Sequence, residues 1–423
     1  MNPEKTPAKI CRLCAETSLP DHRAYTVLTE VLNAVALDDS LRTSIIPDDM
    51  MRTTSRDWRN IQRQHVPVKF KGYEPAEMVR SKLEMFVRDG FRVSEVNMSS
   101  GRRGPPLLGH VRIGDEGMKM LSAVLMKCPL DTLDISGAGL SDRGAIPLAL
   151  VARWSPLLTK LVLDYNELGD PGATTLGNAL RHCPSLEILS VNHINMEPEG
   201  FFAITDALVD CSRAQHASVF KSLSANNNYI VGGMEEDTDD RNYELKEPFY
   251  SALYNLTDQC SNLQVLDLGG NSIINLWEIT QALRHATQLT SLHLDNNEFD
   301  FDGQDPRHLE KFMCALETHP SLTELDLSLN EIWGPVYNRL AQVLPRCTTL
   351  AVLDLSDTTL TDGEAGTMSD AVAQSPHLTS LNLRWNHMSV DGMNALRQAW
   401  LNDDDGLDLR NQSPPDDSDN SDA

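Results

Sequence analysis

The feature that most constrains this chain is a spacing of apolar residues that returns along its length. The stretch from Ser261 to Ile273 follows the pattern L-x-x-L-x-L-x-x-N-x-L, at Leu263, Leu266, Leu268, Asn271 and Ile273. Alternating leucines make a short strand with one buried face, and the Asn turns the chain out of that strand. One such unit cannot fold alone, so the pattern must recur.

The pattern does recur, and full and looser copies together make nine units. Further full copies begin at Leu158, Leu289, Leu322 and Leu378, and looser ones begin at Leu130, Leu186, Phe220 and Leu350. Successive starts such as 130, 158 and 186 are 28 residues apart. Behind the strand, residues four apart form one face of a helix, as at Gly172, Leu176 and Leu180.

Each unit is therefore predicted to be a strand followed by a helix. Successive strands must run parallel, because a crossover helix separates them. Stacked units of this kind form an α/β horseshoe, with parallel strands inside and helices outside.

The unit length, the core pattern and helical halves such as Gly172 to Leu180 resemble the ribonuclease-inhibitor class of leucine-rich repeats, over about residues 91–412. The resemblance implies a leucine-rich-repeat horseshoe solenoid. Because proteins of this class mostly hold another protein, it also implies a binding role.

The charge of the chain is strongly negative and unevenly distributed. Lys and Arg number 36 and Asp and Glu number 61, so the net charge is −25. This charge argues against nucleic acid and membranes as general partners and favours a protein partner with a basic surface. From Met51 to Arg103 the chain is locally basic, with 12 Lys or Arg against 6 Asp or Glu.

The sequence also suggests a compartment. It contains no apolar run of about 18 residues and no apolar core of a signal peptide near its start, so a soluble, unexported protein is expected. Cys183, Cys260 and Cys347 each stand three residues before a leading Leu, a packing position where Cys serves as a small hydrophobe. Reduced thiols predict a cytoplasmic or nuclear location.

Residues 1–90 carry no repeat and are predicted to form a helical cap, with residues 1–20 disordered. Helices are expected at Ala24 to Ala36, Asp48 to Arg63 and Pro75 to Arg88. The stretch from Asp48 to Ile61 resembles the closing helix of an F-box, through Ser55, Arg56, Trp58 and Arg59. That resemblance implies a ubiquitin-ligase adaptor as an alternative function.

A second alternative comes from the basic loop that follows a degenerate first strand at Val93 to Met98. Gly101, Arg102 and Arg103 in this loop resemble the Gly-Arg of an early-repeat loop in the Ran GTPase-activating protein. The resemblance implies that Arg102 or Arg103 would neutralise charge on a phosphoryl group during GTP hydrolysis.

Motifs for catalysis and for metal binding are missing. The C-x-x-C pair of Cys11 and Cys14 lacks the second ligand pair that a structural zinc site needs. The sequence contains no G-x-x-x-x-G-K-[ST], no G-x-S-x-G and no H-E-x-x-H. We therefore expect no enzyme activity, no cofactor and no metal.

Residues 91–412 are assigned to the solenoid. The unit that begins at Phe220 is 43 residues long, and its extra residues predict an extruded acidic loop near Val231 to Tyr250. Leu407 and Leu409 are expected to close the sheet as a stub strand. Residues 413–423 are acidic and are predicted to be disordered.

The repeat also predicts which side chains face the open side of the sheet. In each unit, the residue between the second and third leucines and the two residues after the third point away from the core. Carboxylates dominate these positions from Asp267 to Asp357, and aromatic residues lie nearer the two ends. The predicted protein-binding residues are Asp164, Tyr165, His193, Asp267, His293, Asp295, Asp326, Asp354, Arg384 and Trp385.

These patterns together predict a non-enzymatic scaffold or regulator that binds a basic protein through the concave face of a solenoid. The sequence leaves open the partner's identity, the oligomeric state, and whether the concave face or the loops make the contact.

Overall fold

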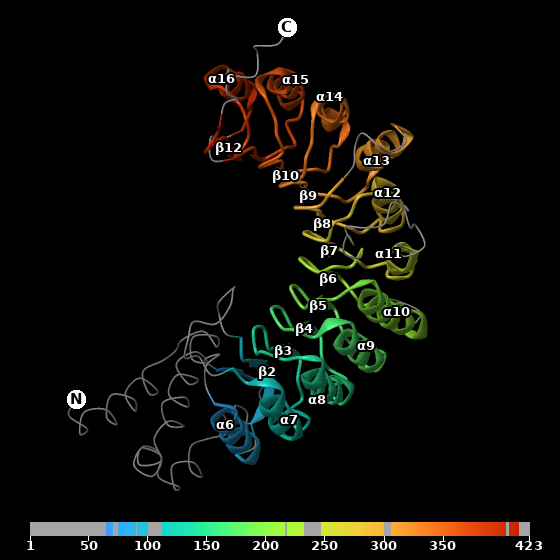
Figure 1. The fold of residues 1–423 in the computed structure, drawn as a ribbon, viewed down its shortest axis with the longest axis vertical. Coiled ribbons are helices and arrows are strands. Elements are labelled where there is room, and N and C mark those ends of the chain that lie inside the picture. The colour runs from blue at the N-terminus through green and yellow to red at the C-terminus, as the bar shows by residue number, and fades with distance from the viewer. Residues whose placement is uncertain are drawn as a thin grey trace, which may run out of the picture.

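A computed structural model describes residues 65–70, 75–89, 91–99, 112–215, 218–231, 247–299, 306–402 and 406–413. Within these residues one sheet of twelve parallel strands runs in chain order from β1 to β12. The helices cover one face of this sheet, and the other face is open and lines the hollow of an arc (Figure 1). The predicted α/β horseshoe solenoid is confirmed.

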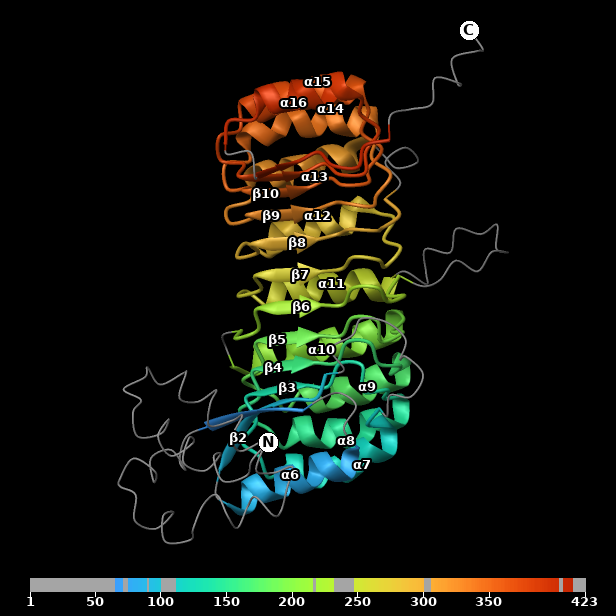
Figure 2. The same ribbon diagram turned by 90° about the vertical axis from the view of Figure 1, so that its left-hand side faces the viewer.

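Most strands are three residues long, because only the alternating part of each repeat is extended. They pair in parallel with the next strand in sequence and stack like the rungs of a ladder when seen from the open face (Figure 2). Their bounds are β1 His65–Lys69, β2 Arg92–Asn97, β3 Thr132–Asp134, β4 Lys160–Val162, β5 Ile188–Ser190, β6 Ser222–Ser224, β7 Val265–Asp267, β8 Ser291–His293, β9 Glu324–Asp326, β10 Val352–Asp354, β11 Ser380–Asn382 and β12 Leu407–Asp408.

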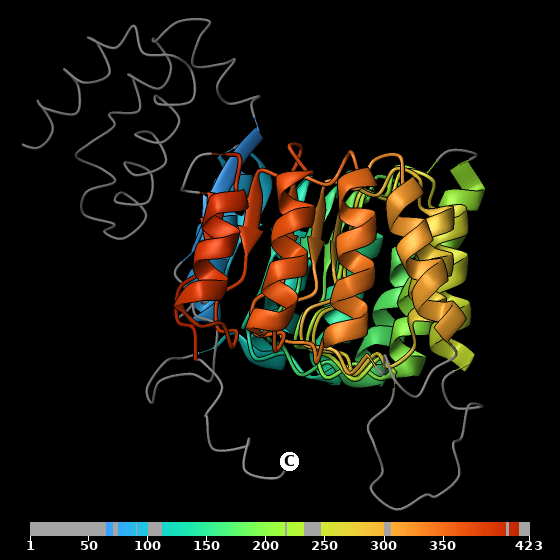
Figure 3. The same ribbon diagram turned by 90° about the horizontal axis from the view of Figure 1, so that it is seen from above.

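The helices lie side by side on the outer face, as the view from above shows (Figure 3). None of those described is both long and apolar enough to cross a bilayer. Their bounds are α6 Ala76–Arg88, α7 Gly114–Leu125, α8 Asp142–Arg153, α9 Gly169–Leu180, α10 Pro198–Gln215, α11 Glu247–Gln259, α12 Leu276–His285, α13 Pro306–Thr318, α14 Gly334–Val343, α15 Asp362–Ala373 and α16 Val390–Ala399, with the 3-10 helix η3 at Leu344–Arg346.

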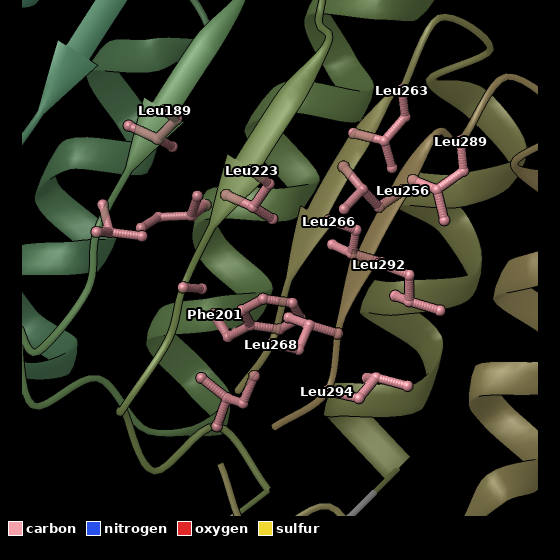
Figure 4. Close-up of a cluster of buried hydrophobic side chains, with 14 of the residues drawn as sticks. Leu189, Phe201, Leu223, Leu256, Leu263, Leu266, Leu268, Leu289, Leu292 and Leu294 are labelled. Carbon is pink, nitrogen blue, oxygen red and sulfur yellow. The ribbon is translucent and has the colours of Figure 1, made fainter. Parts of the chain in front are cut away.

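The core lies between the sheet and the helices and continues through the whole arc. Each repeat contributes its leucines, and residues such as Leu223, Leu266 and Leu292 stand at matching positions on successive strands (Figure 4). Cys183, Cys260 and Cys347 are buried in this core, which confirms their predicted packing role, and Cys128 is buried there as well. Burial raises the pKa of the Cys128 and Cys347 thiols to about 11.

The sheet begins one strand earlier than the repeat pattern predicted. β1 pairs in parallel with β2, and Val68 and Phe70 beside it are buried. Residues 65–89, which were assigned to the cap, therefore continue the solenoid, with α6 packed against α7. The strand lacks the leucine pattern and contains Pro67, which is tolerated at a sheet edge beside a register shift.

The C-terminal end agrees with the prediction. β12 pairs with β11, and Leu409 is buried beneath it, so Leu407 and Leu409 do close the sheet. Residues 1–64, 100–111, 232–246 and 414–423 lie outside the described residues, and so do the predicted cap helices at Ala24 to Ala36 and Asp48 to Arg63 and the pair of Cys11 and Cys14.

The acidic insertion is narrower than predicted. The sequence placed its end at Tyr250, but α11 begins at Glu247, and Phe249 is fully buried. Its ring lies 5.5 Å from the ring of Phe201 on α10, which fixes this part of the chain in the core.

Candidate protein-binding surface

The open face of the sheet is lined by one polar column that runs along the strand ends. In most strands the central leucine is buried and its neighbours are half-exposed, because alternate side chains point to opposite faces. This column contains the predicted residues Asp267, His293, Asp326 and Asp354, and all four are the half-exposed last residues of β7 to β10.

A second column lies in the turn that follows each strand. From the third strand onward, the residue two positions after the last core residue of the strand has a positive φ, between 50° and 65°. Its N–H donates to a carbonyl in the next repeat, as from Tyr165 to Asn192 and from Trp385 to Arg410. We call these residues the turn column: Gly137, Tyr165, His193, Asn227, Gly270, Asn296, Leu329, Asp357, Trp385 and Asn411.

Most members of the turn column suit this left-handed conformation, and four do not. Gly has no Cβ to clash, and Asn and Asp tolerate positive φ better than other residues. Tyr165, His193, Leu329 and Trp385 are bulky and adopt it at a conformational cost. The sequence analysis predicted three of these four as binding residues and missed Leu329, which is found by its positive φ at the equivalent turn position.

Tyr165 and His193 form one contact across neighbouring repeats. Their rings stack, with centroids 4.5 Å apart and an interplanar angle of 17°. Asp164 lies beside them, and its carboxylate accepts a 2.9 Å hydrogen bond from the Asn192 N–H and one of 2.7 Å from the Ser190 hydroxyl. Burial lowers the pKa of His193, although Asp164 opposes the shift, so its imidazole is mainly neutral near pH 7.

Asp267, Asp295 and Asp326 form an acidic centre in the middle of the open face. Burial and these two neighbouring carboxylates raise the pKa of Asp295 to about 6. Burial likewise raises the pKa of Asp326. The Asp295 carboxylate makes no ion pair with a described Lys or Arg, and the opposing effect of His293 on its pKa is the smaller one.

Several predicted carboxylates also serve the fold. Asp354 accepts hydrogen bonds from the N–H and hydroxyl of Ser356, two residues further on, and from the amide of Asn382. Asp267 accepts a 2.7 Å hydrogen bond from the Ser224 hydroxyl and 3.2 Å hydrogen bonds from the Gly269 N–H and the Asn226 amide. These hydrogen bonds stabilise the turns and connect neighbouring repeats. The carboxylates of Asp354 and Asp267 therefore have less capacity than Asp295 to accept hydrogen bonds from a binding protein.

His293 lies within the acidic centre, because on β8 it is in register with Asp267 of β7 and Asp326 of β9. It also lies 3.5 Å from the Glu324 carboxylate. The other predicted residues stand apart from the acidic centre. Arg384 lies 3.8 Å from Asp408 near the C-terminal end, and Trp385 beside it is 54% exposed. Tyr165 follows β4 and Trp385 follows β11, so a partner that touched both would have to span most of the face.

Three carboxylates outside the acidic centre lie close enough together to suggest a metal site. Oxygen atoms of Asp170, Glu197 and Glu199 lie within 4.8 Å of one another. However, Asp170 Oδ1 accepts hydrogen bonds of 2.8 and 2.9 Å from the N–H groups of Glu197 and Gly200 at the start of α10. This carboxylate caps a helix, as acidic side chains commonly do.

The structure adds nothing to the two alternative functions. Arg102 and Arg103, the predicted GTPase contacts, lie outside the described residues, and so does the F-box-like stretch from Asp48 to Ile61.

Comparison with known proteins agrees with the repeats. A family model described as Leucine Rich repeat matches residues 127–149, 155–177, 318–332 and 374–396. Human NACHT, LRR and PYD domains-containing protein 5 is 25% identical over 328 residues, which cover 69% of this chain and 25% of that protein. The protein phosphatase 1 regulatory subunit 37 homolog of Caenorhabditis elegans is 26% identical over 207 residues, covering 44% of this chain and 22% of that protein.

The chain thus spans a quarter or less of the length of these two relatives. Among solved structures, an internalin from Listeria monocytogenes aligns with a TM-score of 0.42 and 16% identity, covering 79% of this chain and 89% of the internalin chain. The repeated pattern, the parallel sheet and the family-model matches together show that the described part of this chain is a leucine-rich-repeat solenoid.

Proposed function

We propose that this chain is a non-enzymatic scaffold or regulator that binds a basic segment of another protein on its concave face. We assign it to the ribonuclease-inhibitor class of leucine-rich repeats and place it in the cytoplasm or nucleus. Neither nucleic acid nor a membrane is a partner in this proposal.

The observation that carries the proposal is the acidic centre. Burial and the neighbouring carboxylates raise the pKa of Asp295 to about 6, and no described Lys or Arg forms an ion pair with it. A Lys or Arg side chain from a partner would supply the missing charge, lower that pKa and form charge-assisted hydrogen bonds. The half-exposed ends of β7 and β9 place Asp267 and Asp326 on the open face, where an extended segment can reach the centre.

The turn column supplies two apolar anchors toward the C-terminal end of this centre. Leu329 and Trp385 are 50% and 54% exposed, which is unusual for large apolar side chains held at a conformational cost. A Trp of this kind is typical of an interface hot spot. The mechanism is rigid presentation, because stacked repeats hold many weak contacts in fixed positions and little ordering entropy is lost on binding.

The similar proteins agree with a role of this kind. One is named as a homolog of a phosphatase regulatory subunit, and the others are named for their LRR domains. Regulation through a bound protein is the function that we carry over from them, and we carry over neither a phosphatase nor any other named partner.

The test is a quantitative pull-down from the source cell with native protein and an Asp295→Asn, Asp326→Asn, Trp385→Ala variant. A matched control is Asp370→Asn, which removes an exposed carboxylate from α15 on the outer face. We expect the variant to lose at least about tenfold in recovered partner, the control to lose none, and binding to weaken with salt.

Circular dichroism checks that the variant is folded. If native protein and variant recover the same proteins in the same amounts, the concave face is not the binding site and the proposal fails. Recovered partners that lack a basic segment would also contradict it.

A further inference from the structure

The outer face of α8 carries a row of exposed apolar side chains. Ile146, Leu150 and Trp154 are spaced four residues apart on the helix and are 57%, 44% and 65% exposed, and Leu157 in the following turn is 50% exposed. Residues at this spacing lie one above another on one side of a helix. We call these four residues the α8 ridge.

The repeats provide an internal standard for this surface. The ridge residues stand 16, 20, 24 and 27 positions after the leading Leu130. In the next repeat the same positions hold Thr174, Asn178, His182 and Ser185, and in the repeat from Leu322 they hold Asn338, Gln342, Arg346 and Thr349. In the repeats that begin at Leu350 and Leu378 these positions are also small or polar: Gly366, Asp370, Gln374 and His377, and Asn394, Gln398, Asn402 and Asp405.

The fold therefore does not require apolar residues at these positions. A solenoid helix buries its inner side, and the outer side is ordinarily polar. Four large apolar residues at equivalent positions of one repeat make a contiguous patch that is typical of an interaction site.

The charges around the ridge are mainly positive, in contrast to the net charge of −25 for the chain. Arg143 and Arg153 lie at the two ends of α8, and neither makes an ion pair with a described residue. Some outer-face arginines elsewhere do pair, as Arg346 does with Glu317 at 2.7 Å and Arg181 with Asp210 at 2.9 Å.

The neighbouring helix adds to this positive rim. Lys119 and Lys127 are exposed on α7 and just after its end, and Lys119 lies 3.8 Å from Glu116. Glu116 and Asp142 are the exposed acidic residues of α7 and α8. The surface around the ridge therefore carries four exposed basic side chains and two exposed carboxylates.

We propose that the α8 ridge docks an amphipathic helix of a partner protein whose apolar stripe is flanked by acidic residues. A helix suits the ridge, because rows of residues four apart pack into the grooves of a second helix. Trp154 is the anchor of the interface, and the positive rim selects acidic flanks. This site is on the opposite face of the sheet from the proposed concave site and does not depend on it.

The rim also argues against a second copy of this chain as the occupant. A symmetric contact through α8 would bring Arg143 and Arg153 close to their own copies. Like charges at an interface weaken association, whereas an acidic partner would neutralise them.

The test uses the full chain and two labelled helical peptides of about five turns. Both peptides carry leucines alternately three and four residues apart, flanked by Glu in one and by Lys in the other. The ridge variant carries Ile146→Thr, Leu150→Asn, Trp154→His and Leu157→Ser, the residues that the next repeat already has at these positions. Fluorescence anisotropy measures the affinity of each peptide for native and variant protein.

We expect the Glu-flanked peptide to bind native protein saturably, and both the ridge variant and the Lys-flanked peptide to bind at least about tenfold more weakly. Arg143→Glu with Arg153→Glu should reverse the preference between peptides. The concave-face variant of the pull-down, Asp295→Asn, Asp326→Asn, Trp385→Ala, should bind like native protein, which separates this site from the concave one.

Equal binding of both peptides, or equal binding to native protein and ridge variant, would overturn the proposal. So would a native dimer in analytical ultracentrifugation that becomes a monomer in the ridge variant, because the occupant would then be a second copy.

Discussion

The main-chain N–H of Asn228 donates a 3.1 Å hydrogen bond to the side-chain oxygen of Asn271, one repeat further along the chain. The Asn271 amide in turn donates to the carbonyls of Leu268 in its own repeat and Ala225 in the previous one, both at 3.0 Å. The side chain of Asn271 is buried, so water cannot reach these polar groups and the hydrogen bonds satisfy them instead. The Asn of the repeat therefore ties successive turns together.

Asn271→Ala should lower the free energy of unfolding by at least about 2 kcal/mol, because it leaves a buried N–H and buried carbonyls without partners. Asn271→Thr should cost less, since Thr358 occupies the same position in another repeat and its hydroxyl donates to the Leu355 carbonyl. Urea denaturation of both variants measures the difference. A loss of less than about 0.5 kcal/mol for the Ala variant would contradict this role.

The conformational cost of positive φ in the turn column can be measured by exchanging the residue types at two of its positions. Leu329 has a φ of 56° and Asn296 has a φ of 50°, and both side chains are exposed. We expect Leu329→Asn to raise stability by about 0.5–1 kcal/mol and Asn296→Leu to lower it similarly, because Asn tolerates this conformation better.

If both substitutions shifted stability in the same direction, the conformational cost assigned to Leu329 would be wrong. A more stable Leu329→Asn protein that binds its partner less well would show that the costly side chain is retained for binding.

Much of the fold followed from the sequence because one spacing specifies strand, turn and helix together. The leucine pattern located the strands from Thr132–Asp134 to Ser380–Asn382, and the apolar periodicity behind them located the helices. β1 was missed because V-P-V-K carries neither the leucines nor the Asn, and its pairing with β2 is a long-range contact that local pattern does not encode.

The candidate surface was only partly predictable. The period of two placed Asp267, Asp326 and Asp354 on the open face, but it does not show which carboxylates have local hydrogen-bond partners. The left-handed conformation of Leu329 is imposed by the turn rather than by the residue, so its own identity gave no signal. The α8 ridge can be found in the sequence only by comparing outer-face positions between repeats, because the leucine pattern reports only the side chains that face the core.

The buried thiols should resist alkylation in the native protein. Burial raises the pKa of Cys128 and Cys347 to about 11, so almost no thiolate is present at pH 8, and both side chains are inaccessible. Cys314 is exposed and should react with iodoacetamide within minutes. Peptide mapping by mass spectrometry reads each site, with urea-unfolded protein as the control in which all react. Labelling of Cys128 as fast as Cys314 in native protein would contradict the packing.

The stability of the protein should depend on pH through Asp295. Its pKa is raised in the folded state from 3.8 to about 6 by burial and by Asp326 and Asp267, so the folded state binds the proton more tightly than the unfolded state. The stability that this proton contributes is fully present below pH 3.8 and is lost as the pH rises through about 6. Asp295→Asn should therefore be more stable than native protein at pH 7.5, and the difference should shrink toward pH 4.

Asp408 provides the opposite control, because hydrogen bonds from Arg410 lower its pKa in the folded state. Asp408→Asn should be less stable than native protein at pH 7.5, and that deficit should stay nearly constant down to pH 4, because the lowered pKa lies below 3.8. Thermal unfolding of the three proteins between pH 4 and pH 7.5 provides the comparison. An Asp295→Asn protein less stable than native at pH 7.5, or a difference independent of pH, would mean that the acidic centre is compensated within the chain, and the case for a basic partner would fall with it.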